Sequence, residues 1–210
     1  MYLYGFINLK KKHSLADKEA EMENFNILLK LARMSILEEF EEKKLIDKDE
    51  WIKKYPFLAE KRACFVTLKV KDRPKGSNLR GCIGSILPYR LLIDDVAENA
   101  KAAAFEDPRF MPLTPEEFEK VKIEVSVLTI PEKLEYEDKE DLMKKVRPGV
   151  DGIILQLANY QATFLPSVWE ELPEFEDFFS HLCRKAGLPG DCLMYHLVIY
   201  TYQTVKVEEK

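Results

Sequence analysis

Short extended segments occur along the chain in adjacent pairs, and this pairing constrains the fold more than any other feature. In residues 63–71, side chains alternate between two faces with a period of two, as in a half-buried β-strand. Residues 72–78 are rich in turn-forming types, and residues 79–86 resume an extended pattern. A second pair, residues 153–157 and 162–165, flanks a short polar turn. Residues 196–205, which are rich in Tyr, Val, Ile and Thr, are expected to form one further strand. The sequence therefore predicts β-hairpins, whose strands are antiparallel.

Helical segments separate these hairpins without alternating regularly with single strands. Apolar residues recur at three- and four-residue steps in residues 17–42, 91–105 and 175–186, which is typical of amphipathic helices. In the second of these segments the apolar stripe comprises Leu92, Val96, Ala100 and Ala103. A further, short helix is expected to begin at Thr114, which can form a capping box with Glu117. Because βαβ repeats need a regular alternation, we favour an α+β fold with antiparallel sheets and flanking helices over a doubly wound parallel sheet. The 210 residues suffice for one substantial domain or two small ones, and any boundary between lobes falls near Pro131.

The charge balance bears on whether the protein binds nucleic acid. Charged residues make up 33% of the chain and the formal net charge is −5. Nucleic-acid binding is driven by basic side chains that displace counterions, so an acidic chain argues against nucleic acid as the default partner. A local exception is residues 61–80, where seven basic residues stand against one aspartate. A basic hairpin there could contact phosphates, although a solvated hairpin whose lysines protect a sheet edge is commoner.

Cysteine usage and apolar runs bear on the cellular compartment. The cysteines, at positions 64, 82, 183 and 192, form no CxxC pair, and no secretory leader precedes them. We therefore expect reduced intracellular thiols. The apolar residues 1–9 are followed rather than preceded by lysines, and no segment approaches the ~18 uninterrupted apolar residues that a membrane span needs. The sequence predicts a cytoplasmic protein without membrane association.

The segment Leu79–Ser85, which reads LRGCIGS, carries most of the chemical interest. On a regular strand, Arg80, Cys82 and Gly84 would share one face, with Arg80 and Cys82 about 6–7 Å apart. A guanidinium near a thiol favours the nucleophilic thiolate. Gly84 would leave the space beside the sulfur empty, as glycines in strands often mark a close approach by a ligand. The segment therefore predicts a shallow cationic slot with a thiol at its base.

The alternative is an inert cysteine. Unpaired cysteines are usually buried and behave as small hydrophobes, and the flanking glycines could serve only the close packing of a helix. A catalytic thiol also needs a base, and the sequence places none of His13, His181 and His196 beside Cys82. We predict neither a metal site nor a cofactor, since no ligand set or phosphate-binding motif of the usual spacing occurs.

The remaining candidate residues are expected to have mainly structural roles. Asp107 and Arg109 flank a proline and are expected to brace their loop as an ion pair, or else to form the rim of the Cys82 site. Arg147 and Asp151 bracket a Pro-Gly turn and are expected to stabilise it. Trp169 is expected in the core, because aromatic side chains mostly serve burial.

The hexapeptide LRGCIG resembles the hallmark of the Ammecr domain family, named after the Alport-syndrome, midface-hypoplasia and elliptocytosis chromosomal region; its microbial members are called AmmeMemoRadiSam system protein A. Further blocks carry the resemblance in the same order: Ala63–Leu68 (ACFVTL), Ala103–Phe110 (AAFEDPRF), Ile123–Leu128 (IEVSVL), Pro148–Ile153 (PGVDGI), Thr163–Trp169 (TFLPSVW) and Lys185–Leu188 (KAGL). The resemblance spans residues 25–205, and residues 1–24 are an extension outside the pattern.

This resemblance implies a compact chain of two unequal, intimately packed lobes, each with an antiparallel sheet and flanking helices. No biochemical activity is established for the family. The system name implies a pathway shared with a Memo-type protein and a radical S-adenosylmethionine enzyme. Carried over by position, the candidate binding site comprises Arg80, Gly81, Cys82, Gly84, Asp107 and Arg109.

Three functions are compatible with the sequence. We rank first a binding or accessory protein, in which the glycine-flanked Arg80/Cys82 pocket receives a protein partner or a small anionic ligand. The alternative is an enzyme, in which Cys82 acts as nucleophile or covalent anchor and Arg80 stabilises negative charge. The third is a nucleic-acid-associated protein that binds through the basic hairpin of residues 61–80.

Overall fold

A computed structural model describes residues 15–71 and 78–210, and of residues 15–25 the backbone alone. The apolar run at residues 1–9, His13 and most of the turn predicted at residues 72–78 lie outside the described residues. The chain divides into two units, each described by itself. Unit 1 is Met1–Val127 with Lys206–Lys210, and unit 2 is Leu128–Val205.

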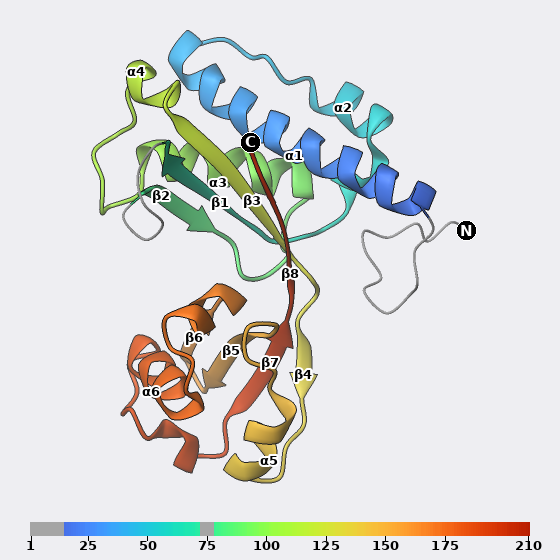
Figure 1. Cartoon of the computed structure of the whole chain (residues 1–210). Helices are drawn as coiled ribbons and strands as arrows, with labels where there is room; N and C mark the ends of the chain where they lie inside the picture. The colour runs from blue at the N-terminus through green and yellow to red at the C-terminus, as the bar shows by residue number, and fades with distance from the viewer. Residues whose placement is uncertain (1–14, 72–77) are drawn as a thin grey trace. The chain divides into compact units, whose positions relative to one another are not determined.

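Unit 1 contains one sheet with the strand order β2-β1-β3-β8 (Figure 1). Strand β1 pairs with both β2 and β3 in antiparallel register, so β2 lies at the edge of the sheet. The elements, in chain order, are α1 (Leu15–Glu41), α2 (Lys48–Lys54), the 3-10 helix η1 (Pro56–Ala59), β1 (Cys64–Val70), β2 (Leu79–Gly84), α3 (Leu92–Phe105), α4 (Pro115–Phe118), β3 (Val121–Leu128) and β8 (Thr204–Glu208).

The core of unit 1 forms because each element buries one side. Val66 and Leu68 on β1 and Ile123 and Val125 on β3 are fully buried, and the residues between them on these strands face the other way. Helix α3 contacts β1, β2 and α1, so it covers this apolar side of the sheet. Its buried residues include the stripe expected from the sequence: Leu92, Val96, Ala100 and Ala103. The predicted strands and helix are thus confirmed in unit 1.

The short helix α4 begins as the sequence predicts. Thr114 accepts a hydrogen bond from the Glu117 backbone N–H at 3.3 Å, and the Glu117 carboxylate accepts one from the Thr114 N–H at 3.1 Å. This reciprocal capping box satisfies backbone donors that a helix start leaves unpaired. It also fixes Glu117 next to the site described below.

Unit 2 contains a second sheet, with the strand order β4-β7-β5-β6. Its strand pairs are antiparallel, and β5 and β6 form the hairpin that the sequence predicts. The elements are β4 (Glu132–Leu134), α5 (Lys139–Lys145), β5 (Gly152–Leu157), β6 (Tyr160–Phe164), η2 (Pro166–Glu170), α6 (Phe175–Lys185), η3 (Cys192–Met194) and β7 (Val198–Tyr202). Both sheets and their flanking helices confirm the α+β class.

Aromatic rings dominate the core of unit 2. Trp169 is buried, as predicted, and its ring stacks on that of Phe178 with the centroids 3.6 Å apart. Phe178, Phe179 and Leu182 on α6 are at most 1% exposed. Stacked and edge-on aromatic contacts of this kind add to the free energy of simple burial.

Two expectations for the C-terminal half are wrong. The single strand expected over residues 196–205 is two strands, because β7 ends at Tyr202 and β8, which begins at Thr204, belongs to the sheet of unit 1. The expectation of four reduced thiols also fails, since Cys183 and Cys192 form a disulfide between α6 and η3. Cys64 and Cys82 are the free cysteines.

Within the described residues, no helix is both long and apolar enough to cross a membrane.

Candidate functional site

Cys82 lies on the edge strand β2, and the side chains of Asp107 and Arg109 bind its backbone. The Cys82 N–H donates to Asp107 Oδ2 at 2.8 Å, and the Cys82 carbonyl accepts from Arg109 Nη2 at 3.3 Å. An edge strand otherwise leaves such outward-facing groups unpaired and open to association with another chain. The two side chains thus take the place of a neighbouring strand at this residue.

Asp107 and Arg109 also bind each other. Arg109 Nε donates to Asp107 Oδ1 at 2.9 Å, and Arg109 Nη2 donates to Asp107 Oδ2 at 2.7 Å. The Arg109 guanidinium holds the pKa of the Asp107 carboxyl well below its ordinary value, against the effect of burial. We call this pair the Asp107–Arg109 clasp. It combines both roles that the sequence left open, since it braces its loop and lies against Cys82.

The Cys82 side chain meets Thr67 of β1. Because both backbone groups of Cys82 point away from β1, the facing residues Thr67 and Cys82 form a non-hydrogen-bonded pair, in which side chains lie close together. The Thr67 hydroxyl accordingly donates to Cys82 Sγ at 3.3 Å. This contact fixes the orientation of a thiol that is neither fully buried nor fully exposed.

The electrostatics keep this thiol protonated. Burial raises the pKa of Cys82 above its ordinary value of 9.0, although the Thr67 hydroxyl and the Arg109 guanidinium act in the opposite direction. The negative charges of Asp107 and Glu124 raise the pKa further. The direction is opposite to the one expected from the sequence, which placed a cation beside the sulfur and anticipated a thiolate.

Arg80 is bound elsewhere. The register between β1 and β2 shifts between Leu68 and Lys69, so Arg80 is an extra residue that breaks the expected alternation with Cys82. Its guanidinium donates to both carboxylate oxygens of Glu117, at 3.1 and 2.8 Å, and to the Met111 carbonyl at 2.9 Å. The side chain is 10% exposed. The positive charge that acts on the Cys82 pKa is therefore that of Arg109.

The glycines that flank Cys82 serve packing. A Cβ at Gly81 would lie 2.1 Å from the Ala103 carbonyl oxygen, so α3 can approach β2 only because residue 81 has no side chain. A Cβ at Gly84 would lie 2.3 Å from the Phe65 ring. The expected empty space beside the sulfur at Gly84 is thus filled by Phe65, and this part of the pocket prediction is wrong.

A polar row across the sheet was missed by the sequence analysis. Thr67 is paired with Cys82 on one side and with Glu124 of β3 on the other. Glu124 is 7% exposed and binds Lys69 Nζ at 2.6 Å and Lys206 Nζ at 3.2 Å. We call Cys82, Thr67, Glu124 and Lys69 the Cys82 row. The signal was present, since the alternation in residues 123–127 places Glu124 opposite the apolar face.

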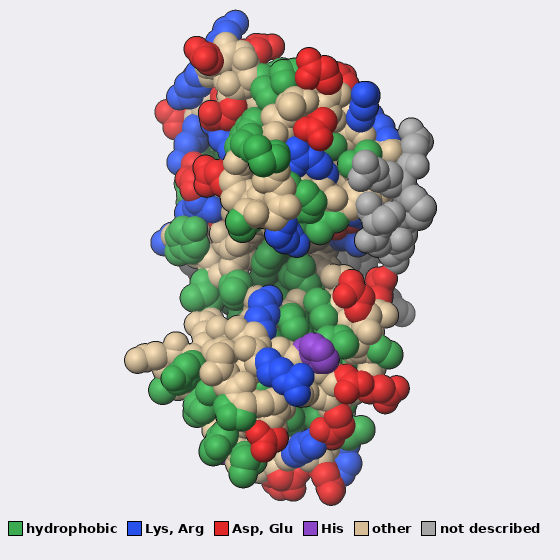
Figure 2. Space-filling model, turned by 90° about the vertical axis from the view of Figure 1, so that its left-hand side faces the viewer, with side chains coloured by type: hydrophobic (Ala, Val, Ile, Leu, Met, Phe, Trp, Pro, Cys, Tyr) green, Lys and Arg blue, Asp and Glu red, His purple; other side chains and the backbone are tan. Residues whose placement is uncertain are grey.

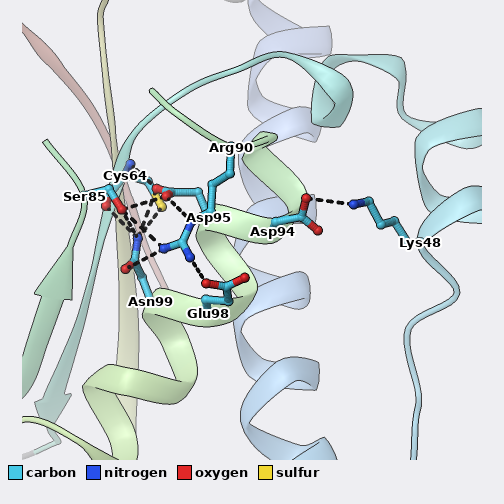
Figure 3. A network of polar contacts seen from close by, with 8 residues as sticks. All are labelled: Lys48, Cys64, Ser85, Arg90, Asp94, Asp95, Glu98 and Asn99. Carbon is cyan, nitrogen blue, oxygen red and sulfur yellow. Dashed lines mark hydrogen bonds and ion pairs between the residues drawn. The ribbon is translucent and has the colours of Figure 1, made fainter. Parts of the chain in front are cut away.

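A second polar cluster, in the core of unit 1, was also missed (Figure 3). Asp95 on α3 is fully buried and accepts hydrogen bonds from the Cys64 N–H at 2.7 Å, Ser85 Oγ at 2.7 Å, Arg90 Nε at 2.7 Å and Asn99 Nδ2 at 3.0 Å. Burial raises the pKa of the Cys64 thiol well above its ordinary value. Because Asp95 is fully satisfied, the cluster ties α3 to β1 and to the end of β2, which is a structural role.

The remaining candidates lie in structural contacts. Asp151 accepts from the Arg147 guanidinium at 2.6 and 2.9 Å, as predicted for this turn. In unit 2, His181 Nδ1 lies 2.9 Å from the Asp177 carbonyl, and the His196 ring stacks on Tyr136. No group of three or more potential metal ligands comes together in residues 15–71 and 78–210.

The basic segment of residues 61–80 is largely neutralised where it is described. Lys69 binds Glu124 and Glu208, and Arg62 binds Glu60. On the face drawn in Figure 2, acidic and basic side chains are interspersed over unit 1. Ion pairs of this kind reduce the charge available for phosphate groups.

Comparison with known proteins places this chain in a family. The family model described as AMMECR1 matches residues 29–207. The chain belongs to the AMMECR1 family. A relative from Methanothermobacter thermautotrophicus, named only "Protein", is 42% identical over 166 residues, which cover 79% of this chain and 83% of the relative. Protein MK0488 from Methanopyrus kandleri is 40% identical over 176 residues, which cover 81% of this chain and 80% of that protein.

A solved member of similar structure supports the assignment. The crystal structure of the uncharacterized protein PH0010 from Pyrococcus horikoshii matches with a TM-score of 0.78 and 37% identity, over 88% of this chain and 90% of that chain. The family resemblance found in the sequence is thereby confirmed. The names of these AMMECR1 relatives state no activity.

Proposed function

We propose that this AMMECR1 protein is a binding component rather than an enzyme that acts alone, and that its ligand or partner contacts the Cys82 row and Arg109. We further propose that it works in a pathway with a Memo-type protein and a radical S-adenosylmethionine enzyme. The second part rests on the family resemblance alone, whereas the first rests on the geometry of the Cys82 row.

The observation that carries this proposal is that the Cys82 sulfur lies half-buried and accepts a hydrogen bond from the Thr67 hydroxyl, in surroundings that raise the pKa of the thiol. Nucleophilic cysteines have a lowered pKa, commonly from an adjacent histidine or a helix N-terminus. Here burial raises the pKa, and the Thr67 hydroxyl fixes the sulfur by donating a hydrogen bond to it. Such an arrangement suits a contact surface better than a reacting group.

Arg109 supplies the charged part of this surface. Its side chain is 53% exposed, although the Asp107 carboxylate that it binds is only 2% exposed. Arg109 uses Nε and Nη2 for Asp107 and for the Cys82 carbonyl. The guanidinium can therefore donate a further hydrogen bond to a carboxylate or phosphate without leaving the clasp, since it carries five N–H donors. This favours a small anion or an acidic segment of a protein as the ligand.

Alkylation of Cys82 as a function of pH tests the claim that it does not act as a nucleophile. Iodoacetamide should react with Cys82 alone in the folded protein, because Cys64 is fully buried and the other cysteines form a disulfide. We expect a reaction midpoint above pH 9.0. Cys82→Ser gives the background rate, and Thr67→Val should raise the midpoint further. A midpoint below about 7.5, the range of activated thiols, would favour the enzyme instead.

Titration with the purified Memo-type protein tests the partnership. We expect Arg109→Ala to weaken binding about tenfold, the usual effect of losing one charge-assisted hydrogen bond. Lys44→Ala, a charge loss at an exposed position, is the matched control and should bind normally. Arg80 is unsuited to this test because its guanidinium is buried against Glu117. If the unmodified chain does not bind, the Memo-type protein is excluded as the partner that contacts Arg109. Titration with a small anion then tests the other ligand class.

A further inference from the structure

Unit 2 contains a cavity that none of the predicted site residues lines. Its volume is about 710 Å³, which lies in the range of small-molecule and peptide sites. One wall is the outer side of α6, the opposite wall is formed by residues 190–194, and Lys139 at the start of α5 contributes to the rim. The cavity therefore lies within one unit, apart from the Cys82 row.

The walls of this cavity are held in fixed positions. Glu176, Ser180 and Arg184 follow one another at four-residue steps and so lie on one side of α6. The Cys183–Cys192 disulfide fastens the opposite wall to the same helix. The absence of a side chain at residue 190 permits the close approach, because a Cβ there would lie 2.7 Å from Ser180 Oγ and 3.1 Å from Arg184 Nε.

Polar groups of both charges line the cavity without a partner in the protein. The side chains of Asp177, Arg184 and Asp191 are exposed and that of Ser180 is half-buried. None of the four makes a hydrogen bond or ion pair with any part of the chain that the structure describes. By contrast, the rim lysine, Lys139, is paired with a carboxylate of α6 at 2.6 Å. The cavity thus offers one free guanidinium, two free carboxylates and a free hydroxyl.

Apolar side chains lie beside these polar groups. Phe179 forms part of the lining and is 1% exposed, whereas Met194 in η3 is 70% exposed, and Leu193 lies next to it. A large exposed methionine at the mouth of a cavity is typical of surfaces that adapt to apolar ligand groups. The lining therefore combines an apolar wall with separate sites for a cation and an anion.

We infer that this cavity binds a short peptide or peptide-like zwitterion with an apolar side chain. Arg184 and Ser180 would donate to the ligand's carboxylate, since a guanidinium fork matches a carboxylate in shape. Asp177 and Asp191 would accept hydrogen bonds from its ammonium group. Leu193 and Met194 would contact the apolar side chain. A volume of about 710 Å³ accommodates several residues rather than a single amino acid.

Calorimetric titration of the full chain with four related tripeptides tests this inference. Lys-Leu-Glu with free ends is the zwitterionic probe, and acetylated and amidated Leu-Leu-Leu is the neutral one. Amidated Lys-Leu-Leu carries only cationic groups, and acetylated Leu-Leu-Glu carries only anionic groups. We expect saturable binding of Lys-Leu-Glu, at least about tenfold tighter than that of any other peptide, because each lost charge removes a charge-assisted hydrogen bond to a cavity group. Equal affinity for all four peptides, or no saturable binding of Lys-Leu-Glu, would overturn the inference.

Variants then locate the binding site. Arg184→Ala should weaken Lys-Leu-Glu binding about tenfold, and Asp191→Asn should do the same. The matched controls are Lys144→Ala and Glu171→Gln, exposed charges of unit 2 outside the cavity lining, which should bind as the unmodified chain does. Normal binding by both cavity variants would refute this placement of the ligand. The tripeptide comparison uses only the unmodified chain, so it decides the inference even where a variant fails to fold.

Discussion

Removal of the Asp107 carboxylate should open the edge strand at Cys82. In the folded protein this carboxylate accepts hydrogen bonds from the Cys82 N–H at 2.8 Å and from the Arg109 side chain at 2.7 and 2.9 Å. Asp107→Ala leaves the Cys82 N–H without its acceptor and the Arg109 guanidinium without its counterion. A hydrogen bond to a charged group contributes about 1.5–3 kcal/mol, so we expect a local loss of about 2 kcal/mol.

Amide hydrogen exchange at Cys82 measures this loss directly. Because β2 is an edge strand, Asp107 provides the protection of this outward-facing amide, and a change of about 2 kcal/mol corresponds to a roughly 30-fold faster exchange. Asp107→Asn keeps an oxygen acceptor and should show a smaller increase. Arg109→Ala removes a half-exposed partner and should change exchange by only a few-fold. Unchanged exchange at Cys82 in Asp107→Ala would refute the clasp.

The same contact predicts a dependence on pH. The folded protein holds the pKa of Asp107 below its ordinary value of 3.8, so the unfolded chain binds the proton more readily in acid. The stabilisation by Asp107 is therefore complete above that value and is lost as the pH falls through the folded-state pKa. We expect the difference in exchange between the unmodified chain and Asp107→Ala to shrink below about pH 3. A difference that stays constant as the pH falls from about 4 to about 2 would contradict the role of the charge.

Three further predictions concern stability. Gly81→Ala should lower the free energy of unfolding by about 3 kcal/mol or more, because the new Cβ would lie 2.1 Å from a backbone oxygen. Gly149→Ala is the control and should cost about 1 kcal/mol, since residue 149 has open space around it but a φ of +76°. Equal losses in denaturant unfolding would contradict the packing role of Gly81. Asp95→Asn should lower the free energy of unfolding by about 3–5 kcal/mol, because it replaces a buried carboxylate that accepts four hydrogen bonds with an amide. Unchanged stability in chemical denaturation would contradict this. Burial raises the pKa of Tyr202 to about 12, so the free energy of unfolding should fall as the pH rises from 10 towards 12. Tyr202→Phe should show a smaller fall, since the raised pKa of Tyr136 also contributes, and an unchanged pH profile would exclude Tyr202 as a cause.

Local patterns in the sequence predicted much of the fold. The alternation in residues 63–71, the apolar stripe of α3 and the capping box at Thr114 depend on neighbours within a few residues, and all three form as expected. The break at Gln203 has no such local cause. Residues 198–208 are continuously rich in strand-forming types, and the break accompanies hydrogen bonds between Gln203 and Thr129, 74 positions away.

The candidate site was harder to predict because it depends on register. The sequence identifies Cys82, Asp107 and Arg109 as candidates, and the structure brings these three together. The sequence could not reveal that Arg80 is an extra residue in its strand. This extra residue directs the Arg80 guanidinium towards Glu117, although the sequence placed it beside the Cys82 thiol. The pairing of Cys183 with Cys192 likewise depends on the approach of two segments in space.

The order of the strands has a consequence for synthesis on the ribosome. The sheet of unit 1 is completed by β8, which pairs with β3 although residues 129–203 lie between the two strands in the chain. Translation proceeds from the N-terminus, so the nascent chain exposes the free edge of β3 until β8 emerges. Unit 2 is contiguous and can complete its own sheet first. Truncation just before β8 should therefore damage the sheet of unit 1, which is made first, more than the sheet of unit 2.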